Sequence, residues 1–361
     1  MKLLKLLPLV AIFLTSAGQA QKQNRIAIPD INGYKTLQCD FHMHTVFSDG
    51  LVWPTVRVGE AYLEGLDAIS ITDHLEYSPH SKDIAVSHNR PYEIAKPSAD
   101  NIGVILIRGS EITRSMPPGH FNAIFLSDSE PLAKDNWRDA FKEAKLQNAF
   151  IFWNHPGWDA QQPDTTLWWP EHTEIYNNGW MNGIEVVNDR SYYEEAFQWA
   201  LDKKLTIIGN SDVHTPIKNE IDFALGEHRA TTLVFAKART AEAIREALDN
   251  RRTAVFHNDL LIGEEQYLRQ IFDNSIEITD TVQDNNRITV KILNKSGLTF
   301  KLKKTDHDKN IVYFRDFEIK PYSRHSFTIR INNNSNGKLN FEVTNLLVKP
   351  GKGLNCSYDL Y

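Results

Sequence analysis

The chain has 361 residues, of which 41% are hydrophobic, 11% aromatic and 24% charged. These fractions are ordinary for a globular protein and exclude a disordered, collagen-like or multi-span membrane chain. Forty basic and 46 acidic residues give a net charge of −6 without a basic stripe, so we expect no binding to a nucleic-acid backbone.

The first twenty residues are typical of a signal peptide. Lys2 and Lys5 precede the apolar run of residues 6–14, and the small residues around Ala20 suit a cleavage site. The run is too short to span a bilayer, and no cysteine lies at the cleavage site to carry a lipid anchor. We therefore expect an exported protein, periplasmic or secreted, without a membrane anchor.

The chain has two cysteines, Cys39 and Cys356, which lie near opposite ends of the mature sequence. Export would permit a disulfide, but a bridge would have to tie a core strand to the C-terminus. Neither residue has the spacing of a zinc or redox motif, so we expect two unpaired, buried thiols.

Between residues 36 and 257 short apolar runs alternate with helix-like segments. The runs that predict strands cover residues 37–39, 68–72, 104–108, 122–125, 149–153, 184–187, 206–208 and 232–235. Helices are predicted over residues 56–66, 136–146, 192–204, 240–250 and 262–274. We interpret the long segment 77–101 as a lid. The alternation predicts an α/β fold with a mainly parallel sheet, open or closed into a barrel.

From residue 276 onward the sequence changes to alternating β-branched and aromatic residues separated by Asn- and Asp-rich turns. This pattern predicts a small all-β sandwich. The chain is therefore divided into a signal peptide (1–20), an α/β domain (21–274) and a C-terminal β-sandwich domain (275–361), whose expected role is packing or dimer formation.

Histidines and acidic residues occur at seven separated strand ends. They are His42, His44 and Asp49; Asp73 and His74; Glu111; His120; His155; Glu185; and Asp212 with His214. Residues at i and i+2 of a strand share a side, so His42 and His44 can bind one ion together. Of the neighbours Asp73 and His74, one should face the site while the other braces the loop. Most of the other histidines fall in polar loops or in the β-rich C-terminal part, namely His172, His228, His307 and His325.

Each motif alone has a structural explanation, such as a hydrogen-bonded core histidine or a solvated loop acid. Together they favour a polynuclear metal site, because parallel α/β folds bring the carboxyl ends of their strands together. Imidazole and carboxylate ligands suit Zn²⁺, Mn²⁺ or Fe²⁺ without choosing among them. A carboxylate inside an apolar strand, as at Glu185, needs a partner or a metal.

In their order along the chain these motifs resemble those of the polymerase and histidinol phosphatase (PHP) family. The matching motifs are His42-x-His44, Asp49, Asp73-His74, Glu111, His120, His155-Pro156, Glu185 and Asp212-x-His214. The resemblance covers about residues 36–257 and implies a distorted (β/α)7 TIM-like barrel, two or three divalent metal ions and hydrolysis of phosphate esters. With its signal peptide, the whole layout is similar to secreted bacterial phosphodiesterases of the organophosphate-degrading type.

The resemblance also implies roles for individual residues. One ion would be held by His42, His44, Glu111 and Asp212, a second by Glu111, His120 and His155, and a third by Asp49, His74 and His214. Glu185 falls where the family is less regular and is treated as a support. Glu111 or Asp212 would be the catalytic carboxylate that bridges the ions or orients a metal-bound hydroxide. Arg114, in the loop between Glu111 and His120, is a candidate for binding the substrate phosphate.

The sequence thus predicts an exported, metal-dependent phosphoesterase, with a phosphodiesterase as the first choice and a small phosphate ester as its substrate. Three alternative functions stay open: a phosphomonoesterase of the histidinol-phosphatase type, a metal-dependent amidohydrolase, and a non-catalytic secreted protein that binds metal or glycan. A homodimer is also possible. An amidohydrolase would usually have a bridging lysine, whereas the bridging candidate here is Glu111.

Overall fold

The computed structural model describes residues 24–306, 308–332 and 337–360. The predicted signal peptide, residues 1–20, lies outside these residues. Among them, no helix is long and apolar enough to cross a membrane. Both cysteines are free and buried, as predicted.

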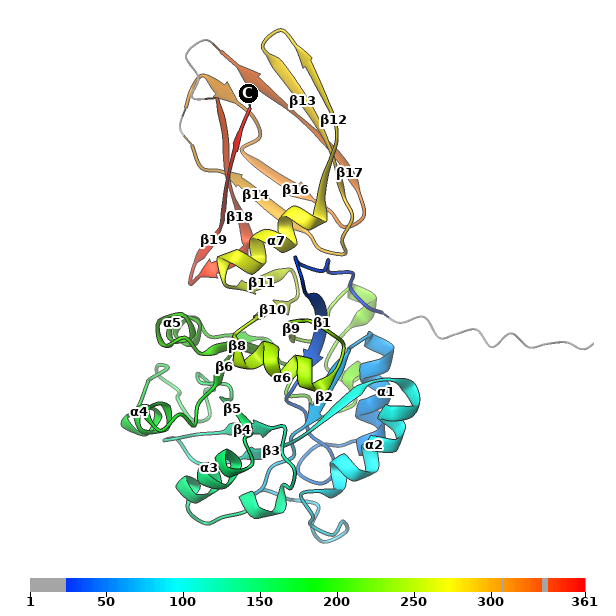
Figure 1. The fold of residues 1–361 in the computed structure, drawn as a ribbon, viewed down its shortest axis with the longest axis vertical. Coiled ribbons are helices and arrows are strands. Elements are labelled where there is room, and N and C mark those ends of the chain that lie inside the picture. Colours follow the sequence, from blue (N-terminus) through cyan, green and yellow to red (C-terminus); the bar gives the residue numbers. More distant parts are fainter. Residues whose placement is uncertain (1–23, 307, 333–336, 361) are drawn as a thin grey trace, which may run out of the picture.

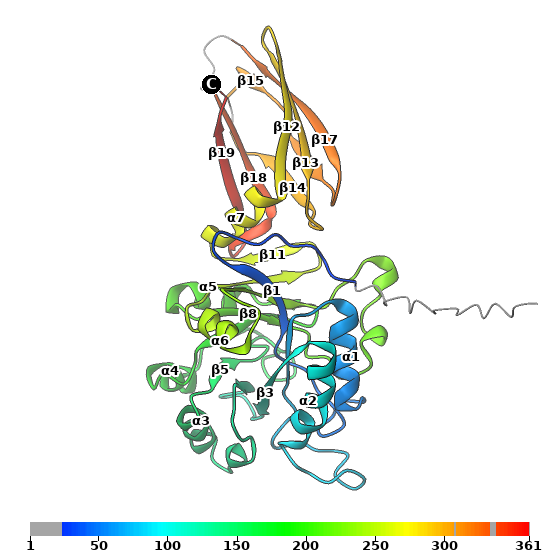
Figure 2. The ribbon, with the colours of Figure 1, turned by 45° about the vertical axis from the view of Figure 1, so that its right-hand side comes forward.

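An α/β domain occupies the N-terminal part and an all-β domain the C-terminal part, stacked along the long axis of the molecule (Figures 1 and 2). The α/β strands are β1 (Lys35–Asp40), β2 (Ala68–Ile71), β3 (Ile105–Ile112), β4 (Phe121–Ile124), β5 (Phe150–Trp153), β6 (Gly183–Asn188), β7 (Ser191–Tyr192), β8 (Thr206–Asn210), β9 (Thr231–Ala236), β10 (Thr253–His257) and β11 (Leu260–Gly263). The helices are α1 (Pro54–Glu64), α2 (Arg90–Ile102), α3 (Trp137–Leu146), α4 (Pro170–Asn177), α5 (Glu194–Lys203), α6 (Ala241–Asp249) and α7 (Glu265–Ser275). Short 3₁₀ turns lie at Glu130–Leu132, Ile217–Asn219 and Phe223–Leu225.

Parallel pairing dominates the strands that carry the predicted site. β1 pairs with β2, β2 with β3, β5 with β6, and β6 with β8, all in parallel. β4 is antiparallel to both β3 and β5, which is the distortion from a regular repeat. Just beyond β8, Val213 bridges Met43 beyond β1, so the carboxyl ends of the first and last of these strands meet. The predicted α/β, barrel-like fold class is confirmed.

The structure corrects three local predictions. Helix α2 (Arg90–Ile102) takes up the second half of the segment 77–101 that was interpreted as a lid, and its Ala95 and Ala99 are buried against α1 and β3. The helix predicted over 262–274 begins only at Glu265, because Leu260–Gly263 is strand β11 and pairs with β10. Helix α4, at Pro170–Asn177, places His172 in the core against Trp153 and not in a polar loop.

The C-terminal domain is the predicted β sandwich. Its strands are β12 (Ile276–Asp284), β13 (Arg287–Asn294), β14 (Phe300–Lys304), β15 (Ile311–Val312), β16 (Asp316–Ile319), β17 (Arg324–Ile331), β18 (Lys338–Lys349) and β19 (Lys352–Asp359). One sheet has the order β12-β13-β17-β15, and the facing strands β16, β14, β18 and β19 continue through β11 and β10 into the barrel. Alternating buried and exposed residues along β13 and β14 give the apolar inner face.

Candidate metal centre

The first predicted ligand pair lies just beyond β1. His42 and His44 flank Met43, which packs into the core cluster beneath α1 and α2. The two imidazoles are fully buried, with ring centroids 5.2 Å apart. Both therefore turn away from that core toward the same space, as their i, i+2 spacing predicts.

A short loop then carries Asp49 over His44, and Asp73 holds this loop in place. Asp73 Oδ1 accepts hydrogen bonds from Thr45 N (2.7 Å) and Ser48 Oγ (2.6 Å), and its Oδ2 accepts one from Thr45 Oγ1 (2.6 Å). Its neighbour His74 points into the site instead. The prediction that one residue of this pair braces the loop while the other faces the site is confirmed.

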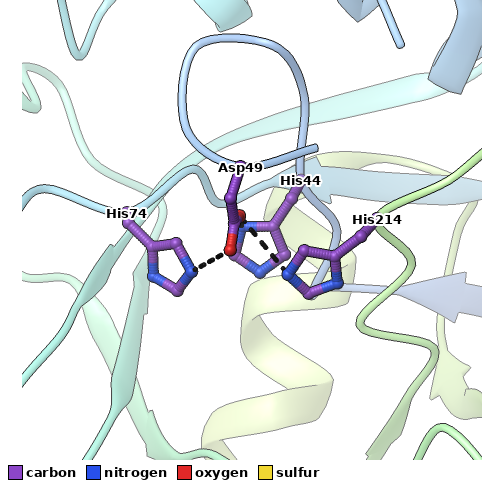
Figure 3. A group of neighbouring side chains, drawn as sticks. All are labelled: His44, Asp49, His74 and His214. Carbon is purple, nitrogen blue, oxygen red and sulfur yellow. Dashed lines mark ion pairs between the residues drawn. The ribbon is translucent and has the colours of Figure 1, made fainter. Parts of the chain in front are cut away.

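Asp49 lies among three imidazoles from three different strand ends (Figure 3). Its Oδ2 lies 3.4 Å from His74 Nε2, and its Oδ1 lies 3.4 Å from His214 Nε2 and 3.7 Å from His44 Nδ1. Burial alone would raise the pKa of Asp49, but hydrogen bonds from His214 and His74 hold it well below its usual range. These four side chains form a group that could hold a metal ion.

A second group joins Asp212, beyond β8, to the pair beyond β1. Asp212 Oδ1 lies 3.0 Å from His42 Nε2 and 2.9 Å from His44 Nε2. The Asp212 backbone has a positive φ of +53°, a conformation that non-glycine residues rarely adopt and that concentrates at functional sites.

Glu185 supports this second group from behind. The carboxylate is fully buried, and its Oε1 lies 2.9 Å from His42 Nδ1. It also accepts hydrogen bonds from His155 N, Asn188 Nδ2 and Asn210 Nδ2. By accepting a hydrogen bond from Nδ1–H, Glu185 leaves the Nε2 lone pair of His42 directed at Asp212 and the ion position.

Glu111 is the centre of a third group, with His74 and His120. His120 Nδ1 lies 2.6 Å from Glu111 Oε1, while Oε2 lies 3.3 Å from His74 Nδ1. The same Oε2 lies 3.1 Å from His42 Nε2 and 3.3 Å from His44 Nε2. Glu111 therefore reaches both the second and the third group, which is the position that a bridging carboxylate needs.

Two imidazoles, His44 and His74, belong to two groups each. A neutral imidazole offers one lone pair, so each ring can serve only one ion. If His44 Nε2 serves the ion beside Asp212, the Asp49 group keeps His74 and His214. This arrangement reproduces two of the ligand sets implied by the family resemblance. One contains His42, His44 and Asp212, and the other contains Asp49, His74 and His214.

His155 is placed less tightly than the resemblance implies. Its ring centroid lies 4.9 Å from that of His120, but its nearest carboxylate contact is a 4.0 Å distance from Nε2 to Asp212 Oδ2. The structure therefore groups His74, and not His155, with Glu111 and His120. Thr113 Oγ1, 2.6 Å from His74 Nδ1, favours Nε2 as the ligand atom of His74, which leaves the third group open to His155. Burial lowers the pKa of His155 to about 3 and keeps its imidazole neutral, the form that binds metals.

The donor atoms of the cluster fit divalent ions. Four buried atoms form no hydrogen bond of acceptable geometry: His44 Nε2, Glu111 Oε1, His120 Nδ1 and Asp212 Oδ1. Burial would raise the pKa of Glu111 and of Asp212, but the neighbouring imidazoles hold both well below their usual range. Burial would lower the pKa of His42, yet Asp212 and Glu185 raise it. The carboxylates favour protonated imidazoles, and bound divalent ions would take the place of these protons.

Two buried arginines support the site and were missed from the sequence. Arg57 on α1 donates to the carbonyl oxygens of His44 (2.9 Å), Val213 (3.0 Å) and Thr215 (2.9 Å), and so ties the two ligand loops together. Its position on the buried face of α1, beside Val58, was the available signal.

Arg229 supports the same region from the end that precedes β9. It pairs with Asp40 Oδ2 at 2.9 Å and with Glu64. Asp40 in turn accepts a 2.6 Å hydrogen bond from Ser211 Oγ, next to Asp212. No motif in the sequence indicated this network.

Arg114, the predicted substrate-binding residue, is held by protein groups. Its Nη2 lies 2.7 Å from Glu76 Oε1 and donates to the carbonyl oxygen of Lys134. Glu76 also accepts a 2.8 Å hydrogen bond from Thr113 N, two residues from Glu111. The guanidinium is therefore largely neutralised, and its contact with a substrate stays a prediction.

Comparison with known proteins found a family model and several similar proteins. A family model described as an Ig-like domain matches residues 275–359. An uncharacterized protein of Methanocaldococcus jannaschii is 38% identical over 82 residues, which are 23% of this chain and 36% of that protein. The chain thus spans about a third of the length of this curated relative. A putative metal-dependent phosphoesterase from Bifidobacterium adolescentis aligns with 49% of the chain and 87% of its own, at 17% identity and a TM-score of 0.39.

A further solved structure aligns with nearly the full length of the chain. This is a two-domain protein from Bacteroides vulgatus containing a predicted PHP-like metal-dependent phosphoesterase, with 56% identity and a TM-score of 0.93. The alignment covers 94% of this chain and 100% of that one. The resemblance drawn from the motifs is thereby confirmed: the chain belongs to the family of two-domain proteins with a PHP-like metal-dependent phosphoesterase domain.

Proposed function

We propose that the protein is an exported phosphodiesterase that depends on two or three divalent metal ions. Family membership supports the coarser part, a metal-dependent phosphoesterase and hence a hydrolase. The observation that carries the proposal is the convergence of eight His, Asp and Glu side chains from separate strand ends into three adjoining groups, with His155 alongside as the ninth.

The ion-holding roles follow from these contacts. His42, His44 and Asp212 would hold one ion, and Asp49, His74 and His214 another, while Glu111 and His120 with His155 would hold a third. Manganese, zinc and iron all suit these ligands. Bound divalent ions would neutralise the ester oxygens and lower the pKa of a bound water.

The two proposed catalytic carboxylates occupy central positions. Glu111 Oε2 lies within 3.3 Å of nitrogens from three imidazoles, which places it between the groups. Asp212 Oδ1 lies between His42 and His44, and its Oδ2 accepts a 3.3 Å hydrogen bond from Asn188. We assign Glu111 the bridging role and Asp212 the task of orienting the attacking water.

A diester is favoured over a monoester by the charges around the site. A phosphate monoester carries up to two negative charges at neutral pH, whereas a diester carries one. The cation predicted to bind the phosphate, Arg114, is already paired with Glu76. A substrate that needs little additional positive charge therefore suits this site best.

The test is a panel of esters offered to the purified protein with added Mn²⁺ or Zn²⁺. We expect bis(4-nitrophenyl) phosphate to be turned over faster than 4-nitrophenyl phosphate, with no turnover of a lactone or an anilide. His42→Ala should reduce turnover by about 100-fold or more because it removes a ligand. His325→Ala, in β17 of the sandwich domain, is the matched control and should not change it.

Other outcomes of the panel would replace the proposal. Preference for the monoester would indicate a phosphatase of the histidinol-phosphatase type. Turnover of the anilide alone would indicate an amidohydrolase. Stoichiometric metal without hydrolysis of any ester would indicate a binding protein.

We also propose export, from the charge, apolar run and small residues at the start of the sequence. Expression of the full chain in a bacterial host should yield exported protein whose first residue is Gln21. An unprocessed protein retained in the cytoplasm would contradict this. The homodimer stays a prediction, which size-exclusion chromatography with light scattering can test.

A further inference from the structure

Two exposed aromatic side chains, Tyr77 and Trp158, lie beside imidazoles of the metal cluster. Tyr77 and Trp158 are 51% and 44% exposed, although large aromatic side chains such as Trp153 are fully buried in the same domain. A single exposed aromatic residue is common on protein surfaces. A pair placed beside the ligands of one site indicates contact with a ligand.

Tyr77 belongs to the connection after β2, three residues beyond His74. Its ring centroid lies 6.0 Å from that of His74, in an edge-to-face arrangement. Neighbouring Glu76 forms the ion pair with Arg114, so the surface next to the tyrosine ring is electrically balanced.

Trp158 has the equivalent position after β5, three residues beyond His155. A hydrogen bond of 3.0 Å from Trp158 N to the carbonyl oxygen of His155 closes the turn between them. The indole ring lies 5.1 Å from the ring of His155 and 5.7 Å from that of His120.

The two aromatic rings are the ends of one row of rings. From Tyr77 the row passes through His74 and His120 to Trp158, with centroid separations of 6.0, 5.8 and 5.7 Å. Ion-binding groups therefore lie in the middle of the row, and a flat, uncharged surface lies at each end.

This arrangement matches the chemistry of a particular diester. The anionic phosphate of a diester would be drawn to the cations in the middle, while its two ester arms would extend toward the ends. Arms that are flat and aromatic can stack on tyrosine and tryptophan, whereas a methyl arm has too little surface to do so.

Building on the function proposed above, we infer that the site selects phosphate diesters with aromatic arms, and that Tyr77 and Trp158 determine this specificity. Neither residue takes part in the bond changes. They affect the relative kcat/KM of different diesters and not the chemical step itself.

The experiment compares two substrates with the same leaving group, 4-nitrophenyl phenyl phosphate and 4-nitrophenyl methyl phosphate. For the metal-loaded wild-type protein we expect kcat/KM to be about tenfold higher for the phenyl ester, because one aromatic stacking contact is worth about that factor. In Tyr77→Ala/Trp158→Ala the ratio should fall to near one, because the phenyl ester loses the stacking of two aromatic arms and the methyl ester that of its nitrophenyl arm alone. The metal content should stay unchanged. The single substitution Trp158→Phe, which keeps an aromatic ring at this position, should retain most of the preference for the phenyl ester.

Leu146→Ala serves as the matched control, since Leu146 is 81% exposed at the end of α3. A wild-type ratio near one, or a ratio that the double variant leaves unchanged, would overturn this inference while leaving the phosphodiesterase intact. Failure of the wild-type protein to hydrolyse either ester would overturn the proposed function and this inference with it.

Discussion

Glu185 shows how a single residue can control the chemistry of the cluster without binding an ion. Four donors converge on its carboxylate, from His42, His155, Asn188 and Asn210. These contacts explain how an acid can lie fully buried inside an apolar strand. They also fix the ring of His42 with Nε2 toward the ion position.

Glu185→Gln should therefore weaken metal binding while preserving the fold. The glutamine has nearly the same shape, but it replaces one acceptor oxygen with an NH₂ group that cannot accept from the surrounding donors. We expect metal affinity to fall by about 10–100-fold, measured by competition with a chelator. The control is Glu194→Gln, an exposed position at the start of α5. Equal affinities for the two variants would contradict the supporting role of Glu185.

The loop that carries Asp49 depends on close packing at the element scale. A Cβ atom on Gly50 would lie 2.5 Å from the backbone carbon of His44 and from Thr45 N. Real Cβ atoms do not approach this closely, so any side chain at this position would displace the loop from His44.

Gly50→Ala should accordingly destabilise the protein by about 1–3 kcal/mol and reduce metal binding. Gly59→Ala offers a matched comparison, because Gly59 lies inside α1 with open space around its Cβ position. That substitution should stabilise the protein by about 0.5–1 kcal/mol and leave metal binding unchanged. Denaturant unfolding and metal titration would measure both effects, and an unperturbed Gly50→Ala variant would rule out this packing argument.

Helix α4 links its buried histidine to the loop that precedes His120. His172 Nε2 donates to the carbonyl oxygen of Pro118 at 2.7 Å, and Nδ1 accepts from Trp169 N at 3.0 Å. Both nitrogens are satisfied in the neutral imidazole, and burial lowers the pKa of His172 to about 4.

The low pKa of His172 predicts a loss of stability in acid. The unfolded chain takes up the proton near pH 6.5, whereas the folded protein resists it down to about pH 4. The contribution of this residue is therefore complete above pH 6.5 and is lost as the pH falls toward 4, by about 3 kcal/mol in all. Denaturant unfolding of wild-type and His172→Gln proteins between pH 7.5 and 4.5 measures the difference. Parallel pH profiles of the two proteins would contradict the prediction.

At the level of elements, periodicity in the sequence was sufficient where it was regular. The strand predicted over 149–153 is Phe150–Trp153, and the helix predicted over 136–146 is Trp137–Leu146. Helix α2 was missed because Pro97 lies inside it, where a proline argues against a helix, whereas Pro91 lies in the first turn, where a proline is tolerated. Packing of Ala95 and Ala99 stabilises it nevertheless.

The site was predictable in its members and less so in its geometry. Strand-end positions identified the imidazoles and carboxylates, since parallel strands must present their carboxyl ends together. Which group His74 joins depends on side-chain direction and on Thr113, neither of which the spacing encodes. The supports from Arg57 and Arg229 depend on contacts more than 150 residues apart and leave no local pattern.

On the scale of the whole molecule, the two domains share one sheet and one core. β11 pairs in parallel with β18, with Leu261 opposite Leu346 and Ile262 opposite Leu347. A single apolar cluster includes Phe256 of the barrel side together with Phe300 and Leu346 of the sandwich. The junction, where α7 lies between the domains, is visible in Figure 1.

This shared core predicts that the domains unfold together. Leu346→Ala removes a fully buried side chain at the junction and should reduce stability by about 2–5 kcal/mol. Fluorescence and circular dichroism should still report one coincident transition. Leu225→Ala, at a position that is 79% exposed, is the control and should change little. If the protein unfolds in two separate transitions and Leu346→Ala shifts the earlier transition alone, the domains unfold independently.

The central claim is that the nine side chains hold metal ions at the carboxyl edge of the barrel. Its most direct test is an anomalous difference map from a crystal of the protein grown with Mn²⁺ or Zn²⁺. The account predicts two or three peaks about 2.0–2.3 Å from the His42–Asp212, Asp49–His214 and Glu111–His120 donor atoms. A map from metal-loaded crystals with no peak among these side chains, or with ordered metal only elsewhere, would contradict it.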